Sequence, residues 1–315
     1  MRCGDLFARL NYYKGKCLRM PRFWSAVIVT IDGKYGHGGL TDRFRHILSI
    51  YSYCKKRGIV FKLLYSYPYN LTEILLPNKY DWRMSESKVS QSFFDTRELF
   101  LYVDTSKGKT LKQENYRILQ ILDKKLFNSR WMQFHVYGNA CFAEEDFYSL
   151  FHELFRPSPL LISELEKYSK FLPSSYDAVT LRFQNLLGDF KEGEFPEIEE
   201  YEKSQLIQKC INKIKKLYGE NFFKSKKILV TSDSSLFMQQ CKTSLPFACI
   251  MPGKVVHVDR GEQADLLTHT RSFVDLYMLM RANRCVLLRT GDMYESGFPA
   301  FAARIGNKEF VKIDF

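Results

Sequence analysis

The alternation of apolar and polar residues predicts a strand, a helix and a second strand near the N-terminus. The run Ala26–Ile31, which is apolar apart from Thr30, is typical of a buried strand. From Leu40 onward apolar residues recur at helical spacing, and Gly58 after Arg57 indicates where that helix ends. Ile59–Leu64 is again short and, apart from Lys62, apolar. Elements of these lengths predict a βαβ unit with a parallel sheet.

The second half of the chain repeats this alternation of strands and helices. Its apolar runs predict strands at Ala178–Phe183, Ile228–Thr231, Lys254–Val258, Cys285–Leu288 and Phe310–Ile313. Its helical spacings predict helices at Leu160–Phe171, Glu199–Tyr218, Leu266–Arg281 and from Pro299 to Gly306. Residues 65–155 are harder to interpret and predict only two strands, near Leu99–Val103 and Met132–Val136.

A break in this pattern marks the expected domain boundary. Pro157 and Pro159 interrupt the chain, so we place one domain at 1–157 and a second at 158–315. The expected fold class is α/β, with two domains that each contain a mostly parallel sheet. Ligands of such sheets bind beyond the carboxyl ends of the strands and between domains.

Composition narrows the class of protein and adds a charge signal. The 315 residues are 45% hydrophobic and 26% charged, which is typical of globular domains and excludes disorder and collagen-like repeats. Lys and Arg number 47 against 35 Asp and Glu, a net charge of +12, and 15% of the residues are aromatic. This balance suggests an anionic partner: a nucleic acid, a membrane surface or a phosphorylated small molecule.

Cysteines and the N-terminus bear on the compartment. The eight cysteines are scattered without a Cys-x-x-Cys pair, so we expect no structural zinc and favour a reducing cytoplasm. The apolar run Phe23–Ile31 is shorter than the roughly 20 residues that span a bilayer. Before it stand six basic residues and one acidic residue, Asp5. This leader is either a solvated segment or a peripheral contact with the anionic inner face of a membrane.

The first candidate for chemistry is the run Gly38-Gly39-Leu40-Thr41-Asp42-Arg43. Glycines between a strand and a helix let backbone N–H groups approach a phosphate or sugar, and the helix dipole favours an anion there. The alternative is a tight turn that needs a positive φ, with Asp42 as a simple partner of the helix dipole.

The second candidate is Arg182, which lies late in an otherwise apolar predicted strand. A buried guanidinium is costly unless it is paired, and its fork suits a diphosphate. The alternative is a structural ion pair with a carboxylate, such as that of Asp189.

Two serine-containing segments and one histidine complete the candidates. Ser232-Asp233-Ser234-Ser235 ends a predicted strand, where polar residues commonly face a ligand, but it could equally cap a helix. Ser296-Gly297-Phe298-Pro299 opens a predicted helix, whose free N–H groups form either an anion site or an ordinary cap. His257 ends a predicted strand without clustered partners, so we expect no metal site there.

In this order, the candidates resemble motifs of the fucosyltransferase superfamily, which includes nodulation fucosyltransferases, α1,2- and α1,6-fucosyltransferases and protein O-fucosyltransferases. Gly38–Arg43 is similar to the family's Gly-Gly-Leu-Gly-Asp-Arg-Leu-Arg-like motif. Arg182 stands where the family has its His-x-Arg motif, with Thr180 at the histidine position. Val230–Asp233 resembles the family's Thr-Asp strand end, and Ser296–Phe298 its Ser-x-Phe segment.

The resemblance implies the GT-B fold, in which two Rossmann-like domains with mostly parallel sheets face a cleft. The acceptor-side domain is expected at 1–157 and the donor-binding domain at 158–315. It implies an inverting glycosyltransferase that moves fucose from GDP-fucose to a bacterial polysaccharide, lipopolysaccharide or oligosaccharide. The implied partners are a nucleotide sugar and a glycan acceptor. Neither a metal nor a cofactor is expected, in line with the lack of an Asp-x-Asp pair in the sequence.

The resemblance also implies roles for individual residues. Arg182 is expected to neutralise the β-phosphate as the glycosidic bond breaks. Asp42 is the first candidate for a carboxylate near the acceptor hydroxyl, and Asp189 the second. Donor contacts are expected from Gly38, Gly39, Arg182, Asp233, Ser234, His257, Ser296, Gly297 and Phe298.

Other classes of protein stay open at this stage. A nucleic-acid-binding protein would explain the net charge. The basic residues are spread through the chain, however, and no RNA or DNA motif occurs, so we expect no nucleic-acid partner. A non-catalytic protein that binds a sugar or nucleotide would keep the same pocket. The same fold could also use another nucleotide sugar.

Overall fold

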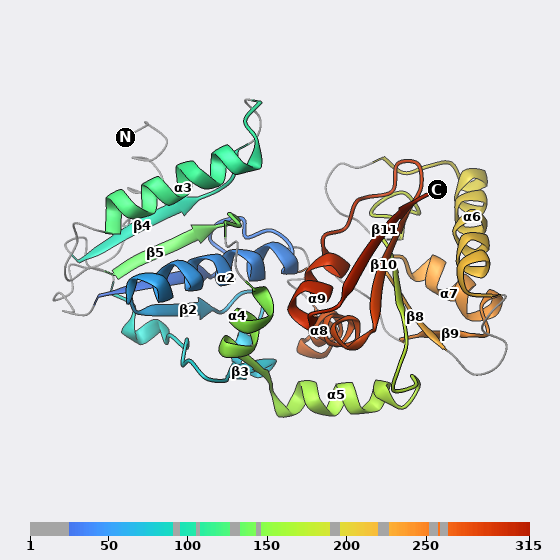
Figure 1. The fold of residues 1–315 in the computed structure, drawn as a ribbon, viewed down its shortest axis with the longest axis horizontal. Coiled ribbons are helices and arrows are strands. Elements are labelled where there is room, and N and C mark those ends of the chain that lie inside the picture. Colours follow the sequence, from blue (N-terminus) through green and yellow to red (C-terminus); the bar gives the residue numbers. More distant parts are fainter. Residues whose placement is uncertain are drawn as a thin grey trace. The chain divides into compact units, whose positions relative to one another are not determined.

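The computed structural model describes residues 25–90, 95–104, 108–126, 133–142, 146–189, 196–219, 227–251, 258 and 264–315. The chain divides into two compact units, shown in Figure 1. The first comprises Met1–Thr72, Pro77–Glu145 and Glu153–Phe155, and the second Glu73–Leu76, Asp146–His152 and Arg156–Phe315. Each unit is described by itself below.

Two short segments that precede residue 157 belong to the second unit, and their contacts explain why. Ser158 bonds to segment 73–76, its N–H donating to the Ile74 carbonyl at 2.9 Å and its hydroxyl to the Glu73 carbonyl at 2.7 Å. In segment 146–152, the Phe147 ring packs edge-on against Phe301, with 6.2 Å between the ring centroids. The chain therefore enters the second unit three times.

The first unit is built on a four-stranded parallel sheet in the order β2-β1-β5-β4. Its strands are β1 (Ala26–Ile31), β2 (Phe61–Tyr65), β4 (Thr96–Leu101) and β5 (Gln133–Gly138). All six residues of β1 are buried, including the polar Thr30, as the predicted buried strand requires. The ends of β1 and β2 are in register, with Ile31 beside Tyr65.

Helices connect these strands. α2 (Leu40–Arg57) joins β1 to β2 and ends at Gly58, whose φ of 64° is left-handed, so the βαβ unit is confirmed. α3 (Leu111–Leu126) lies between β4 and β5 in the sequence and was not predicted. The short elements are η1 (Leu71–Glu73), β3 (Leu75–Pro77), η2 (Glu86–Lys88), α4 (Phe147–Leu154) and β6 (Phe155–Pro157), with β3 paired to β6.

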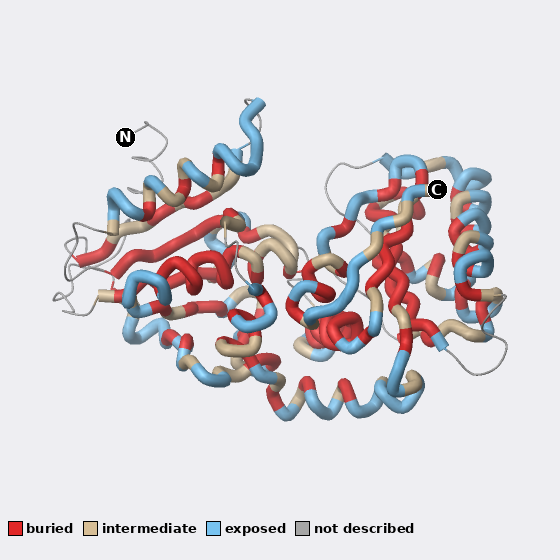
Figure 2. The backbone as a smooth tube through the Cα atoms, viewed as in Figure 1, coloured by how far each residue is buried: buried red, intermediate tan, exposed pale blue. Residues whose placement is uncertain are grey.

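The second unit is built on a five-stranded parallel sheet in the order β11-β10-β7-β8-β9. Its strands are β7 (Ala178–Leu181), β8 (Ile228–Ser232), β9 (Ala248–Ile250), β10 (Arg284–Arg289) and β11 (Glu309–Asp314). The central strands β7, β8 and β10 are its most buried part (Figure 2). The expected α/β class with parallel sheets is confirmed.

Helices cover both faces of this sheet. α6 (Glu200–Tyr218) and α7 (Ser235–Ser244) lie on one side, and α8 (Leu266–Arg281) and α9 (Phe298–Gly306) on the other (Figure 1). α5 (Pro159–Ser169) packs against α8. Apolar side chains of β7, α6 and α7 form one core, which includes Val179, Ile211 and Phe237.

Most predicted elements of the second unit are present. α8 has the predicted bounds, and α9 ends at Gly306 as expected, although Asn307 supplies the left-handed φ of 51°. α7 and β9 were not predicted. The strand predicted at Lys254–Val258 lies, apart from Val258, outside the described residues. None of the helices in the described ranges is both long and apolar enough to cross a membrane.

Candidate functional site

The order of the strands marks a candidate site in the second unit. From β7 the chain runs to β8 and β9 on one side, whereas β10 and β11 lie on the other side of β7. The strand order therefore reverses between β7 and β10. In open α/β sheets, ligands bind at such a switch point, beyond the carboxyl ends of the strands. The first residue after β7 at this edge is Arg182.

Arg182 faces a carboxylate from the neighbouring strand. β7 and β8 are in register at Leu181 and Ser232, so the next residues, Arg182 and Asp233, stand side by side. Nε of Arg182 lies 3.8 Å from Oδ2 of Asp233. The Asp233 side chain is 3% exposed, whereas that of Arg182 is 21% exposed and reaches the surface. The ion pair raised as an alternative for Arg182 exists, but its partner is Asp233 and not Asp189.

Asp233 also holds the turn that carries Arg182. Its Oδ1 accepts the N–H of Phe183 at 2.9 Å, and its Oδ2 accepts the N–H of Gln184 at 2.8 Å. Gln184 has a φ of 52°, which is unfavourable for a residue with a side chain, so these bonds stabilise a strained turn. Burial raises the pKa of Asp233, while Arg182 and the two N–H groups oppose that rise.

Tyr294 completes the surroundings of Arg182. Its N–H donates to the Arg182 carbonyl at 3.2 Å, and the guanidinium carbon lies 5.6 Å from the centre of its ring. Tyr294 belongs to the loop that follows β10, on the other side of the switch point. This loop leads within three residues to Gly297, the N-cap of α9.

The N-terminus of α9 has the features of an anion site. Gly297 offers no side chain to cap the helix, so the first N–H groups depend on other partners. One of them is Ser296, which is 5% exposed and whose Oγ accepts the Phe298 N–H at 3.3 Å. Ser296, Gly297 and Phe298 thus lie where the sequence placed them, at a helix start that Tyr294 connects to Arg182.

Ser234 and Asp189 have a structural role at the start of α7. Ser234 is fully buried, and its Oγ accepts the N–H of Phe237 at 3.0 Å. Oδ2 of Asp189 accepts the Ser234 hydroxyl at 3.1 Å and the Leu236 N–H at 2.7 Å. This arrangement corresponds to the helix-capping alternative for Ser234, because a fully buried hydroxyl is not accessible to a nucleotide sugar. It likewise favours a structural role for Asp189 over an acid–base role.

The remaining candidates lie in the first unit. Gly38 has a φ of 72°, and Gly39 is the N-cap of α2 without a side-chain bond. Arg43 is 1% exposed and points inward: its Nε donates to the Gly38 carbonyl at 3.1 Å. Its Nη1 donates to the Tyr67 carbonyl at 2.8 Å. Arg43 therefore fixes the glycine-rich turn, while Asp42 stays in the first turn of the helix.

The last two positions are His257 and Thr180, which stands two residues before Arg182. His257 lies outside the described residues. Thr180 is buried, and its hydroxyl shares a 2.8 Å hydrogen bond with that of Thr231 across the sheet. Within the described ranges, no group of three or more His, Cys, Asp and Glu side chains is placed to hold a metal ion.

The sequence analysis missed Tyr294 and the pairing of Asp233 with the Arg182 turn. A signal for both was present. Arg182 and Asp233 each directly follow an apolar run, and parallel neighbouring strands bring such positions together. Tyr294 follows a third run, but only the strand order shows that β10 is the neighbour of β7.

Comparisons with known proteins identify the fold. No family model and no curated protein sequence matches the chain. Among solved structures, the α-1,6-fucosyltransferase NodZ soaked with GDP-fucose matches at 13% identity and a TM-score of 0.57, over 90% of this chain and 93% of that one. NodZ is also solved from Bradyrhizobium, with a TM-score of 0.55 at 13% identity over 89% and 92% of the two chains.

Two further solved fucosyltransferases match. FUT1 of Arabidopsis thaliana in complex with GDP has 14% identity and a TM-score of 0.55 over 98% of this chain and 75% of that one. POFUT1 in complex with GDP has 13% identity and a TM-score of 0.52 over 94% and 99%. The chain therefore has the GT-B fold, the fold expected from its motifs.

Proposed function

We propose that the chain is an inverting glycosyltransferase that transfers fucose from GDP-fucose to a bacterial glycan, such as a polysaccharide, lipopolysaccharide or oligosaccharide. The observation that carries this proposal is Arg182 at the switch point of the second sheet, held by Asp233 and Tyr294. The fold of GDP-bound fucosyltransferases supports the choice of donor. We expect a cytoplasmic enzyme, whose basic N-terminus could contact an anionic membrane.

In the proposed reaction, an acceptor hydroxyl oxygen attacks the anomeric carbon of fucose from the face opposite the diphosphate. The bond between that carbon and the β-phosphate oxygen breaks, and GDP leaves with the electron pair. Arg182 neutralises the charge that develops on this oxygen, and its fixed position means that little reorganisation is needed in the transition state. The protein itself supplies the charge, so the reaction is proposed to need no metal.

Two helix starts are proposed to assist. The N-terminus of α9, which follows the loop that contacts Arg182, carries free N–H groups and a positive partial charge that favour an anion. In the first unit, Gly38 and Gly39 open α2 without a side chain that would block an approaching ligand. Asp42, in the first turn of α2, is the proposed acceptor of the hydroxyl proton. Asp189, whose Oδ2 accepts two hydrogen bonds at the start of α7, is not proposed for this role.

A thermal-shift panel tests the donor assignment. We expect GDP and GDP-fucose to raise the unfolding temperature and UDP-sugars to leave it unchanged, because a ligand stabilises only the state that binds it. GDP-mannose distinguishes fucose from another guanosine-linked sugar. If no guanosine nucleotide shifts the unfolding temperature, the proposal is wrong.

Substitution of Arg182 tests the mechanism. Arg182→Ala is expected to lower the rate of GDP release from GDP-fucose by about 100- to 1000-fold, the usual effect of losing one preorganised charge in the transition state. The matched control is Arg281→Ala, which removes an exposed arginine at the end of α8. Near-normal turnover in Arg182→Ala would remove the basis of the mechanism.

A further inference from the structure

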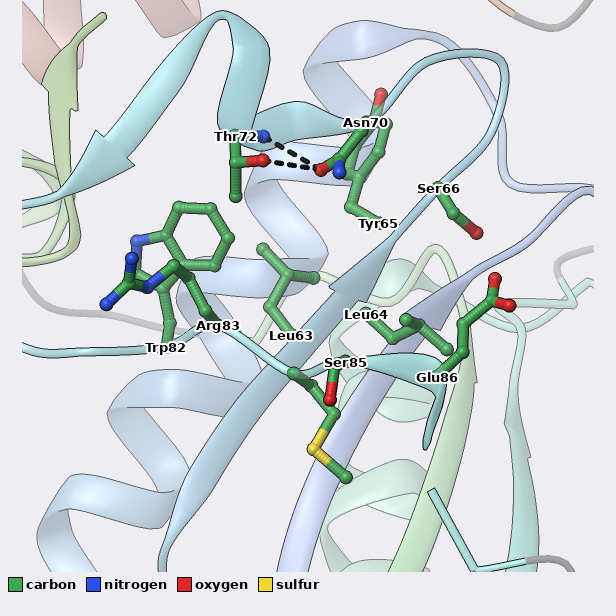
Figure 3. A pocket seen from close by; sticks show the side chains of 11 residues that line it. Leu63, Leu64, Tyr65, Ser66, Asn70, Thr72, Trp82, Arg83, Ser85 and Glu86 are labelled. Atoms are coloured by element: carbon green, nitrogen blue, oxygen red, sulfur yellow. Dashed lines mark hydrogen bonds between the residues drawn. The ribbon is translucent and has the colours of Figure 1, made fainter. Parts of the chain in front are cut away.

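A cavity of about 380 Å³ lies in the first unit, alongside β2. Segment 82–84 adds to the edge of that strand: the Leu63 N–H donates to the Trp82 carbonyl at 2.7 Å, and the Met84 N–H to the Leu63 carbonyl at 3.2 Å. Figure 3 shows the side chains that line the cavity, which come from β2, from the loop after it, from η1, from segment 82–85 and from the start of η2. The volume is within the range of about 300–1,000 Å³ usual for small-ligand sites.

The lining combines an apolar floor with a polar rim, which carries hydroxyl and amide groups as well as the charged side chains of Arg83 and Glu86. Leu64 and Met84, which are 9% and 8% exposed, form the floor, whereas Ser66, Asn70 and Ser85 are exposed polar residues at the rim. The Oδ1 atom of Asn70 accepts the N–H and the hydroxyl of Thr72, which fixes the amide in place. Its Nδ2 group can then donate to a ligand. Hydroxyl and amide groups that can donate and accept match a ligand rich in hydroxyl groups.

The charges of the cavity argue against an anionic ligand. Both the Nε and Nη2 atoms of Arg83 are bonded to the carboxylate of Asp81, at 2.9 and 3.1 Å. This bidentate pair lowers the pKa of Asp81 to about 2, so the arginine charge is balanced across the whole neutral range. Within the described part of the chain, Glu86 has no such partner. A carboxylate without a cation repels phosphate but accepts hydroxyl groups well.

Ser66, which lines the cavity, lies at the carboxyl ends of β1 and β2, the end of the sheet at which α2 and its glycine-rich turn begin. The N–H groups of Ser66 and Tyr67 both donate to the carbonyl of Ile31, the last residue of β1. Tyr67 in turn packs on Gly33 in the loop after β1, and its carbonyl accepts the Nη1–H group of Arg43, which fixes the glycine-rich turn. Ser66 is therefore one residue from the carbonyl that holds Arg43 at this turn. A ligand in the cavity would lie in the same unit as Asp42 and, like Asp42, near the carboxyl ends of β1 and β2.

We propose that this cavity binds an uncharged pyranose unit of the glycan acceptor. Leu64 and Met84, which pack in one apolar cluster, receive the C–H face of the ring, and Ser66, Asn70 and Glu86 bind its hydroxyl groups. That the bound sugar is the acceptor of the transfer reaction rests on the proposed function. That the cavity binds a neutral sugar rests on its lining alone. It assigns acceptor recognition to the loop after β2 and to the start of η2.

Saturation-transfer difference NMR tests the site without the donor. The probes are methyl β-D-galactopyranoside and methyl N-acetyl-β-D-glucosaminide, with glucose 6-phosphate as the anionic comparison. We expect signal from at least one neutral glycoside and none from the phosphate. Ser66→Phe fills the cavity, and Glu86→Gln removes its carboxylate; each is expected to weaken binding by about tenfold or more, equivalent to roughly 1.4 kcal/mol.

Matched variants and the nucleotide panel separate the outcomes. Ser163→Phe and Glu309→Gln change exposed residues outside the cavity and should leave the glycoside signal intact. Unfolding temperatures check that Ser66→Phe is folded, and Glu86→Gln is a conservative second variant. If GDP stabilises the chain but neither glycoside binds, or binding survives both cavity variants, this inference fails alone. If glycosides bind through the cavity while no nucleotide stabilises the chain, the proposed donor chemistry fails and the sugar site stands.

Discussion

The carboxylate of Asp233 lies 3.8 Å from Nε of Arg182 and at the same time accepts the N–H groups of Phe183 and Gln184. One buried side chain thus orients the arginine and holds the backbone turn from which the arginine projects. This double role explains why the turn tolerates a φ of 52° at Gln184. It also makes Asp233 a positioning residue for the proposed leaving-group contact.

Asp233→Asn is expected to lower the free energy of unfolding by about 1–3 kcal/mol. The substituted amide has only one oxygen, so its NH2 group would face the N–H of either Phe183 or Gln184. Urea unfolding measures the change, and Asp292→Asn, at an exposed position of the same unit, is the control. Equal stability of the two variants would show that the carboxylate does not hold the turn.

Gly38→Ala is expected to destabilise the chain by about 1–2 kcal/mol, the usual cost of a left-handed residue that has a Cβ. Gly38 has a φ of 72°, and its new Cβ would lie 3.2 Å from the Cβ of Asp42. The matched control in the same turn is Gly36→Ala, where an added Cβ meets nothing within 4 Å. Thermal unfolding of both variants checks this, and a larger loss in Gly36→Ala would contradict it.

Arg43→Lys is expected to cost about 2–4 kcal/mol, because lysine keeps the charge but loses the planar fork. The fork reaches the Gly38 carbonyl at 3.1 Å, the Tyr65 hydroxyl at 2.9 Å and the Tyr67 carbonyl at 2.8 Å. Arg45→Lys, two residues along the same helix and partly exposed, should change stability little. Chemical denaturation of the pair measures the difference, and similar losses would argue against the inward clamp.

His46 predicts a dependence of stability on pH. Burial lowers its pKa from 6.5 to about 4, and its Nδ1 lies 2.9 Å from the Ala140 carbonyl. His46 is protonated below about pH 6.5 in the unfolded chain, but only below about pH 4 in the folded chain. The stabilising contribution is therefore complete above the unfolded pKa and is lost as the pH falls through this window, by about 3 kcal/mol in all.

His46→Asn tests this dependence, because its amide can still donate to the Ala140 carbonyl but does not titrate. Between pH 7 and pH 4, the free energy of unfolding of the original chain should fall by about 3 kcal/mol more than that of the variant. Urea titrations at several pH values measure the two slopes. Parallel curves would mean that His46 is protonated as readily in the folded chain as in the unfolded one.

The apolar pattern alone determined those helices and strands that local periodicity and end signals define. α8 occupies Leu266–Arg281 as predicted, and β1 is the buried strand that its apolar run indicated. The motif order also led to the GT-B fold, which the solved fucosyltransferases share. Local periodicity and end signals suffice there because each element buries its own apolar face.

Only the tertiary structure decided the partner of Arg182. Asp189 is seven positions away in the sequence, yet the parallel register of β7 and β8 brings Asp233 to the arginine and leaves Asp189 to cap α7. The inward direction of Arg43 likewise depends on Tyr65 and Tyr67, on the far side of a βαβ crossover. Strand order and register arise from the burial of whole sheets, which no local pattern contains, so they decide which distant side chains meet.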